Sequence, residues 1–350
     1  MANLTITAYY TRKGLKYGSI GLVVFLILRF LFQATTDYWK KIHPPPPPPP
    51  TVAFDKLPQI KFPKQENLPE IKYKLETIEG VVPSVDKIGK VYVISKVNPN
   101  LLGLNRAKDL AKKMGFSSEP TQINPRLYRF VSQTTPVTTL DIDVVTGYFT
   151  LNYDYRNDQS ILAEKKLPSD EQAIAEAKNF LSTLGLLADD LQEGSAKVSY
   201  YRFSPTDLLP ALSLSEADFV RVDLFRQTLD DKQIISEKPN RSLISFLFSG
   251  VRERTKRTLE VKYTYNPIER ENFATYPLKT SSVAWSELNS GHGYIAELGD
   301  NQDGQVIVRR ISLSYFESEE PQNYLQPVFI FEGDNGFSAY VPAIDPKWTD

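Results

Sequence analysis

The longest run of apolar positions lies near the start of the chain, at residues 17–34 (YGSIGLVVFLILRFLFQA), where Arg29 is the one charge. A helix of about 20 residues crosses the hydrocarbon core of a bilayer, so this run predicts a transmembrane helix. The long Arg29 side chain lies near one end and can reach the headgroups. A cleaved signal peptide is the alternative, but Phe32 stands where a cut after Ala34 needs a small residue. The pattern therefore favours an uncleaved anchor in membrane lipid.

Basic residues on the two sides of this run predict its orientation. Arg12, Lys13 and Lys16 precede the run, whereas two lysines follow it. Because cytoplasmic loops carry an excess of Lys and Arg, we expect residues 1–16 to form a cytoplasmic tail. The bulk of the chain is C-terminal to the run. This predicts a single-pass protein of the cell membrane with an extracytoplasmic body.

Seven consecutive prolines, Pro44 to Pro50, follow the anchor. Such a run adopts polyproline II at roughly 3.1 Å per residue, so it forms a semi-rigid rod of about 20 Å. A ligand for an SH3-like domain is the alternative, but the position next to the anchor favours a spacer. Further prolines continue to residue 69. We therefore predict a stalk over residues 35–70.

Beyond the stalk, apolar residues recur at helical spacing in three stretches. The clearest begins at Ser169, which forms a capping box with Gln172, and it ends at Gly185. A second helix is expected at about 105–115. The third is shorter, at 281–290, with a serine as its first capping residue.

Alternation of apolar and polar residues predicts strands between these helices. They are expected at 71–76, 127–131, 140–144, 149–153, 198–203, 219–226, 243–248, 259–265, 306–315, 328–331 and 337–341. Irregularly spaced helices separated by hairpins are typical of the α+β class with antiparallel sheets. We therefore expect two to three helix-plus-sheet modules, with boundaries at 71–160, 161–275 and 276–350.

Composition narrows the chemistry that this body can carry. The 350 residues include no Cys, which excludes disulfides, thiolate metal sites and cysteine nucleophiles. The formal net charge is −1, so no overall charge attracts nucleic acid, and we expect no nucleic-acid partner. Only two histidines occur, His43 and His292, with no metal-binding or catalytic pattern around either.

Two short motifs match known sites in part. Ser84–Lys87 has the S-x-x-K spacing of penicillin-binding enzymes, but the S-D-N and K-T-G motifs that complete their site are absent. Asp300–Gly304 resembles the start of a calcium loop, yet Ile311 stands where the loop needs Glu. We therefore predict no catalytic residue, no cofactor and no metal site.

Two pairs of segments carry a family resemblance. A helix that ends near glycine, followed by a hairpin with D-x-x-T-G, occurs as AKDLAKKMGF with DVVTGYFTLNYDY, and its pattern partly recurs as AIAEAKNFLSTLGL with KVSYYRF. This pattern resembles PepSY-like domains. The C-terminal TYPLKTSSVAWSELNSGHGY, SLSYFES and YLQPVFIFEGDNGFSAYVPAI are similar to the end of the YycI-type regulators. That resemblance implies an extracytoplasmic, single-pass protein that acts on a membrane sensor kinase.

The resulting prediction is a non-catalytic binding or regulatory protein that acts on an envelope protein. Exposed strand edges in the C-terminal module could accept a partner segment by β-augmentation. The hairpin 332–336 with its flanks supplies the candidate contacts Phe331, Asp334, Asn335 and Phe337. A structural or assembly component of the envelope is the first alternative. A carboxylate-dependent cell-wall hydrolase is the second. The sequence does not predict an oligomeric state.

Overall fold

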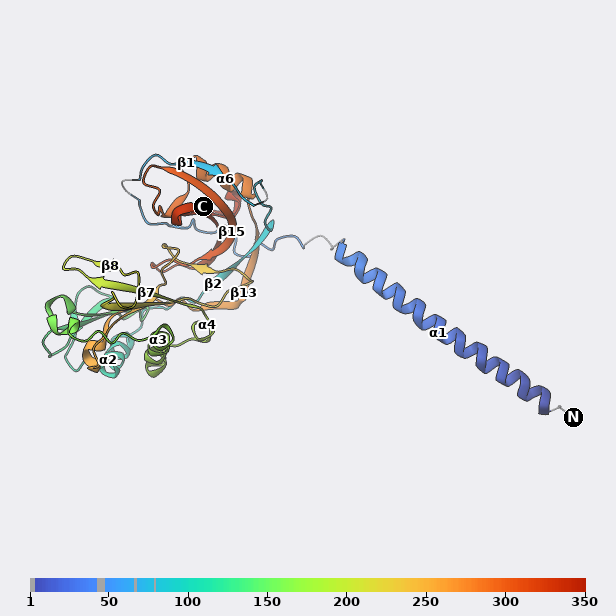
Figure 1. Cartoon of the computed structure of the whole chain (residues 1–350), viewed down its shortest axis with the longest axis horizontal. Helices are drawn as coiled ribbons and strands as arrows, with labels where there is room; N and C mark the ends of the chain where they lie inside the picture. Colours follow the sequence, from blue (N-terminus) through green and yellow to red (C-terminus); the bar gives the residue numbers. More distant parts are fainter. Residues whose placement is uncertain (1–3, 43–47, 66–67, 79) are drawn as a thin grey trace. The chain divides into compact units, whose positions relative to one another are not determined.

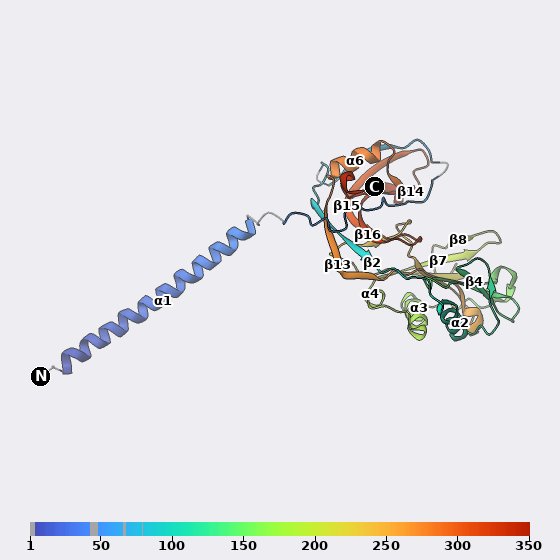
Figure 2. The same ribbon diagram turned by 180° about the vertical axis from the view of Figure 1, so that it is seen from behind.

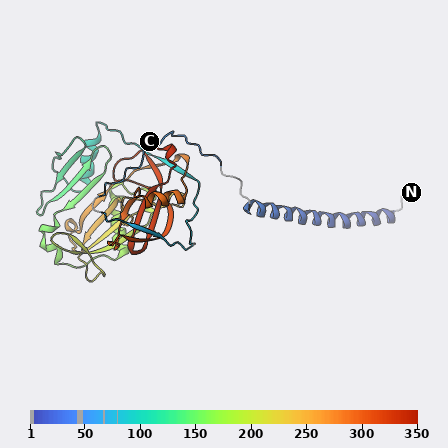
Figure 3. The same cartoon turned by 90° about the horizontal axis from the view of Figure 1, so that it is seen from above.

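The computed structural model describes residues 4–42, 48–65, 68–78 and 80–350. The chain divides into two compact units, Met1–Pro49 and Pro50–Asp350. The first unit is dominated by α1 (Leu4–Ile42), which is one unbroken helix in all three views (Figure 1, Figure 2 and Figure 3). The second unit, the body, has two sheets and its own buried cores.

Helix α1 is long and apolar enough to span a membrane. Its segment Ala8–Trp39 reaches a mean hydropathy of 1.9 over an 18-residue window, and none of that window is buried. The helix has 39 residues, or about 58 Å at 1.5 Å per residue, against about 30 Å of hydrocarbon core. It therefore includes part of the predicted tail and residues 35–42 of the predicted stalk, because no proline interrupts the chain before residue 44. Prolines 44–47 of the predicted rod lie outside the described residues.

One part of the body is a nine-stranded antiparallel sheet. Its strands, in spatial order, are β3 (Thr121–Gln122), β4 (Leu127–Val131), β5 (Thr138–Asp143), β6 (Phe149–Tyr153), β12 (Thr258–Tyr263), β11 (Ile244–Ser249), β9 (Phe219–Leu224), β7 (Ala196–Phe203) and β8 (Leu208–Pro210). Helices α2 (Gly103–Lys113) and α3 (Asp170–Leu184) cover one face of this sheet (Figure 1 and Figure 2). The short helices α4 (Asp189–Gln192) and α5 (Arg254–Arg257) and two 3₁₀ turns, Tyr155–Asn157 and Gln159–Leu162, complete it.

Small side chains bring both helices close to the sheet. Ala107 and Ala111 of α2, and Ala173 and Ala177 of α3, are at most 3% exposed in the core that the helices share with the strands. An alanine on the buried stripe lets a helix backbone approach the larger side chains of the strands. Leu181 of α3 extends the same stripe and is fully buried.

The helix boundaries follow the capping residues closely. The predicted capping box at the start of α3 is present, with Ser169 accepting from the Gln172 backbone N–H and the Gln172 side chain accepting from that of Ser169. Gly185 ends the helix with a φ of +74°, which favours glycine. Helix α6 (Ser281–Asn289) lies within the predicted range, but its cap is the Thr280 side chain rather than a serine.

The other part of the body is an eight-stranded sheet. It contains β1 (Lys72–Leu75), β15 (Gln305–Phe316), β16 (Tyr324–Gly333), β17 (Ser338–Pro342) and β14 (Tyr294–Glu297) in that order, with β2 (Ile88–Ile94), β13 (Ile268–Pro277) and β10 (Ile234–Ile235) attached. Two 3₁₀ turns, Asp334–Gly336 and Pro346–Trp348, lie near its C-terminal strands. β1 and β10 pair with β15 in parallel. The expected α+β fold is confirmed, but this sheet is mixed rather than wholly antiparallel.

Strand pairing does not follow the predicted module boundaries. β1 and β2, which the sequence analysis placed in the first module, pair with β15 and β16 near the C-terminus. β6 of the first predicted module pairs with β12 of the second, so these two modules share one sheet. Alternation predicts a strand and the face it buries, but it does not predict which distant strand lies beside it.

Residues 50–65, which we call the strap, were predicted as stalk and instead lie on the body. Leu57 is fully buried, and its backbone N–H donates to the Trp348 carbonyl at 2.8 Å. Phe62 stacks on Tyr294 with ring centroids 4.8 Å apart. The predicted stalk is therefore wrong for these residues. The apolar side chains of the strap pack into the core of the body instead of remaining in solvent.

Polar contacts hold the strap as well. The Tyr276 hydroxyl donates to the Asp55 carbonyl at 3.0 Å, and the Gln326 side chain donates to the Pro58 carbonyl at 2.8 Å. Farther along, the Gln65 amide both accepts from and donates to the backbone of Ile295 in edge strand β14. These contacts anchor the strap in the eight-stranded sheet.

Candidate functional site

The four residues proposed as partner contacts surround the hairpin between β16 and β17. Phe331 is fully buried and Phe337 is 2% exposed, so both are core residues and cannot contact a partner. The reason is that Phe331 belongs to the inward-facing positions of β16, as Phe329 does. Asn335 is exposed at a φ of +57°, and its side chain donates to the Asn301 side chain at 3.1 Å.

Asp334, the fourth residue, is held by a salt bridge. Arg309 donates to its carboxylate at 2.6 Å and also pairs with Glu76 at 2.8 Å. The hydrogen bond from Arg309 holds the pKa of Asp334 below its usual range. β16 has β15 and β17 beside it, and β17 has β14 on its other side. The hairpin therefore does not present the free strand edge that β-augmentation requires.

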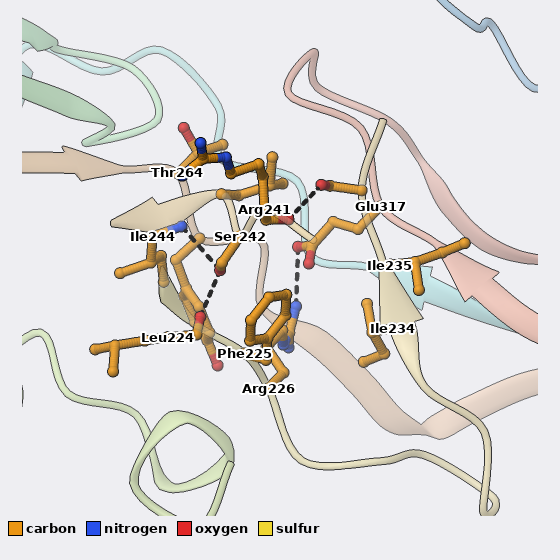
Figure 4. Close-up of a pocket in the computed structure, with 13 residues that line it drawn as sticks. Leu224, Phe225, Arg226, Ile234, Ile235, Arg241, Ser242, Ile244, Thr264 and Glu317 are labelled. Atoms are coloured by element: carbon orange, nitrogen blue, oxygen red, sulfur yellow. Dashed lines mark hydrogen bonds and ion pairs between the residues drawn. The ribbon is translucent and has the colours of Figure 1, made fainter. Parts of the chain in front are cut away.

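A buried ion network joins the two sheets near the ends of β9 and β15. Arg226 donates to Asp190 at 2.6 Å and to Glu317 at 3.0 Å, and all three side chains are less than 10% exposed. Figure 4 shows Arg226 and Glu317 pointing toward one another from separate segments. Tyr265 donates to Asp190 at 2.9 Å, and the Asn266 side chain donates to Glu317 at 3.1 Å.

The surroundings of this network indicate a structural role. The cavity beside it encloses about 20 Å³, which is room for about one water molecule and too little for a substrate. Burial raises the pKa of Glu317, although the positive charge of Arg226 acts in the opposite direction. Each charge has a partner of opposite sign, so the network serves to hold the two sheets together.

The face of the nine-stranded sheet opposite its helices is the more open candidate. Leu140, Leu151 and Val261 point into the helix-covered core, so their neighbours point away from it. Pairing registers align these neighbours into two rows across the strands. One row is Thr139, Asn152, Glu260, Leu247 and Arg221; the other is Arg129, Asp141, Thr150, Lys262, Ser245, Asp223 and Lys197. We call this surface the uncovered face.

Most carboxylates of the uncovered face have cationic partners. Arg129 donates two hydrogen bonds of 2.7 Å to Asp141. Asp223, with a side chain 1% exposed, pairs with Arg221 at 2.9 Å and with a second arginine at 3.5 Å. Lys262 pairs with Glu319, which follows β15. This pattern leaves Glu260 as the carboxylate of the two rows with no ion pair among the described residues.

A pocket of about 380 Å³ opens beside Glu260. Its volume is within the range of small-ligand sites. β5, β6, β12 and the turn after β6 line it, through Val137, Thr139, Asn152, Tyr153, Asp154, Tyr155, Arg156 and Glu260. Sequence reasoning missed this pocket, because its residues come from strands about 100 positions apart. The alternation in TLDIDVVTGYFTLNYDY marks the outward-facing residues, but the pairing of β6 with β12 is not visible in it.

Tyr155 and Glu260 give the pocket its chemistry. Tyr155 is 4% exposed, and its hydroxyl is buried beside Glu260 and Arg156 without a hydrogen bond of normal geometry. Burial raises the pKa of Tyr155, and the negative charge of Glu260 raises it further. The Arg156 guanidinium lies 5.8 Å from the centre of the Tyr155 ring and donates to the Thr206 carbonyl at 3.0 Å.

Asp158 supports the wall of this pocket and makes stability depend on pH. It accepts from the Tyr153 hydroxyl at 2.6 Å, from Ser160, and from Lys256 at 3.0 Å. Burial alone raises its pKa, but these hydrogen bonds outweigh burial and hold the pKa far below the ordinary value. A carboxyl with a lowered pKa stabilises the fold above its unfolded pKa, about 3.9, and this contribution is lost as the pH falls.

We expect Asp158→Asn to lower the free energy of unfolding by about 1–3 kcal/mol at pH 7, because Lys256 loses its charged partner. The difference from the unchanged chain should shrink as the pH falls from about 5 towards 2, because over this range the unfolded chain takes up a proton at Asp158 that the folded chain does not. Urea unfolding of the full chain in detergent across this range measures it. A difference that stays constant with pH would contradict the proposed role of Asp158.

Comparisons with known proteins identify no family. No protein-family model matches the chain, and no curated protein matches its sequence. The crystal structure of an uncharacterized protein from Eubacterium rectale ATCC 33656 is 12% identical over 73% of this chain and 82% of that one, with a TM-score of 0.31. The Bacillus megaterium YpeB C-terminal domain is 12% identical over 73% of this chain and 96% of that one, with a TM-score of 0.34.

Both TM-scores are below 0.5, so neither likeness carries an argument about this chain. The resemblance of its sequence to PepSY-like domains and YycI-type regulators stays a prediction. What the structure does define is a class of architecture: one helix able to span a membrane, followed by a two-sheet α+β body.

Proposed function

We propose that this protein is a membrane-anchored, extracytoplasmic binding protein that regulates another envelope protein, such as a sensor kinase, and that it acts by binding rather than by turnover. The observation that carries the proposal is the uncovered face, with its pocket beside Glu260. The exposed and partly exposed side chains of this face come from β4, β5, β6, β12, β9 and β7, whereas Leu247, Ser245 and Asp223 are at most 5% exposed. Its mixture of charged, amide and hydroxyl groups suits recognition of another polypeptide.

The first unit supports the same proposal. Helix α1 can hold the body at a membrane, and the basic residues before its apolar core favour a cytoplasmic N-terminus. The strap packs on the body directly after the run of prolines. A partner in the same membrane meets such a body at a high effective concentration, so a modest interface is sufficient for regulation.

Single-cysteine labelling tests both topology and binding, because the chain has no natural cysteine. Thr150→Cys places a thiol on the uncovered face, and Ala175→Cys places one on the exposed side of α3. A membrane-impermeant maleimide added to intact cells is expected to label both variants of the full chain. Protection of both thiols would reverse the proposed orientation.

The same two variants locate the binding surface. With a short thiol-linked photo-crosslinker, Thr150→Cys is expected to yield a discrete adduct with one membrane protein in the native membrane, and Ala175→Cys is not. Adding Lys262→Glu, which reverses a charge opposite Thr150 and two residues from Glu260 on β12, should reduce that adduct. Equal adducts from both thiols, or none from Thr150→Cys, would contradict binding through the uncovered face.

A further inference from the structure

Large aliphatic side chains that are more than half exposed lie at three loops of the described part of the body. The loop before α2 exposes Leu101 (100%) and Leu102 (64%), the loop after β8 exposes Leu212, and the loop after β1 exposes Ile78 and Val81. Adjacent apolar side chains at an exposed tip indicate contact with a membrane or with a partner. The charges near each loop distinguish the three.

The loop before α2, residues 96–102, has an excess of positive charge around it, and we call it the basic loop. Four exposed cations belong to this loop and to α2: Lys96, Arg106, Lys112 and Lys113. None of the four makes an ion pair among the described residues. Asp109 is the one carboxylate of α2. The Arg106 backbone N–H donates to the Leu102 carbonyl at 3.0 Å, so Arg106 lies one helical turn from the exposed leucines.

The other two loops lack this excess. Residues 203–220, which include Leu212, contain three carboxylates and no Lys or Arg. Arg309 and Arg310 lie in a hollow with Ile78, but both are paired with carboxylates at 2.5–2.8 Å. An anionic surface is therefore attracted to the basic loop and not to the other two.

The fold holds the basic loop in a defined shape. The Asn100 side chain accepts from the Leu102 backbone N–H at 3.0 Å, and the Asn100 carbonyl accepts from the Gly103 N–H at 3.1 Å. A Cβ atom at position 103 would lie 2.4 Å from the Val144 carbonyl oxygen, so glycine lets the first turn of α2 pack closely on the end of β5. This turn projects Leu101 and Leu102 into solvent.

We propose that the basic loop binds an anionic lipid surface, with Leu101 and Leu102 inserted among the lipid headgroups and with Arg106 and the lysines of α2 against the phosphates, an inference that rests on the proposed attachment of the chain to a membrane. Apolar side chains beside cations are the combination that binds proteins peripherally to anionic bilayers. A free phosphate would be attracted to the cations but would gain nothing from the leucines.

The attachment through α1 makes this contact easier to form. In the sequence only residues 43–49 separate α1 from the body, so a lipid surface is present at a high effective concentration. Helix α2 covers one face of the nine-stranded sheet, and the uncovered face is the opposite one (Figure 2). Lipid contact through the basic loop therefore leaves the uncovered face available to another protein.

The test places one environment-sensitive probe at each of two exposed leucines of the full chain, which has no natural cysteine. Leu101→Cys and Leu212→Cys are labelled with NBD and reconstituted into vesicles of phosphatidylcholine, with or without phosphatidylglycerol. The probe at 101 is expected to show a blue shift and a severalfold rise in emission in the vesicles with phosphatidylglycerol. The probe at 212, an equally exposed site without cations, should show neither change. High salt should reduce the response at 101, because it screens the cations.

Two further variants test the cations and the leucines separately. Arg106→Glu should abolish most of the response at 101, whereas Arg270→Glu, the same change at an exposed position of β13, should leave it unchanged. With the probe moved to Val97→Cys, replacing Leu101 and Leu102 by serine should also remove the response. All these positions are exposed, so the urea midpoints should stay close to that of the unchanged chain.

Equal responses at 101 and 212, equal responses in the two kinds of vesicle, or a response unaffected by Arg106→Glu would each overturn the lipid contact. A response seen only in native membranes would assign the basic loop to a protein partner and would overturn it too. Flotation of the same vesicles tests the anchor. If the chain floats without a response at 101, the anchor stands and the lipid contact is wrong; if the chain does not float, both fail. The Thr150→Cys adduct tests the proposed binding function independently of this loop.

Discussion

Replacing Arg226 by alanine is expected to lower the free energy of unfolding of the full chain by about 3–5 kcal/mol. Arg226 lies between Asp190 and Glu317, and all three side chains are less than 10% exposed. Removing the cation leaves two carboxylates buried together without a charged partner, which costs more than the pair itself contributed. The loss also opens the junction of the two sheets, because Arg226 follows β9 and Glu317 follows β15.

Urea unfolding in detergent, followed by the fluorescence of Trp285 and Trp348, measures this effect. Arg309→Ala is the matched control, because Arg309 also contacts two carboxylates but has a side chain 46% exposed. Exposed pairs contribute at most about 1 kcal/mol, so this variant should be close to the unchanged chain. A loss for Arg226→Ala no larger than that for Arg309→Ala would show that the network does not hold the sheets together.

Leu57→Ala is the second change with a large expected effect, about 2–5 kcal/mol of destabilisation. Leu57 is fully buried in the core of the eight-stranded sheet, although it lies only seven residues after the last proline of the run. Truncating its side chain leaves a cavity in that core. It also weakens the strap, whose backbone at Leu57 bonds to Trp348 and Asp350 at 2.8 and 3.0 Å.

Leu212→Ala makes the same chemical change at a position 96% exposed. Its effect should lie within about 0.5 kcal/mol of zero. The same urea titration compares the two variants. If both are neutral, residues 50–65 behave as the solvated stalk that the sequence predicted, and the packing of the strap into the core is wrong.

Local signals predicted the helices well. The capping box at Ser169 and the glycine at 185 place α3 within one residue, because caps act on the backbone beside them. The strands between 127 and 153 also follow from alternation and from a Thr-Gly turn. The predicted contacts Phe331 and Phe337 failed for a related reason. Their aromatic character is equally typical of a core and of an interface, and only their burial distinguishes the two.

The candidate site could not be predicted in the same way. Glu260 is one of many carboxylates in the sequence, and nothing near it in the chain marks it as part of a pocket. Its significance comes from β12 lying beside β6, which brings it to Asn152 and to the turn that carries Tyr155. Register between strands about 100 residues apart depends on the whole core, so no local pattern contains it.

The sequence by itself determined a helix long and apolar enough to span a membrane, a run of prolines after it and an α+β body, because hydrophobic length, proline content and the periods of apolar residues are local properties of a chain. Only the tertiary structure decided that the strap belongs to the core, that two predicted modules share one sheet, and that one sheet face remains without helices. These three features depend on which apolar surfaces pack against each other. That choice is made by the packing of residues hundreds of positions apart, such as Leu57 with Trp348.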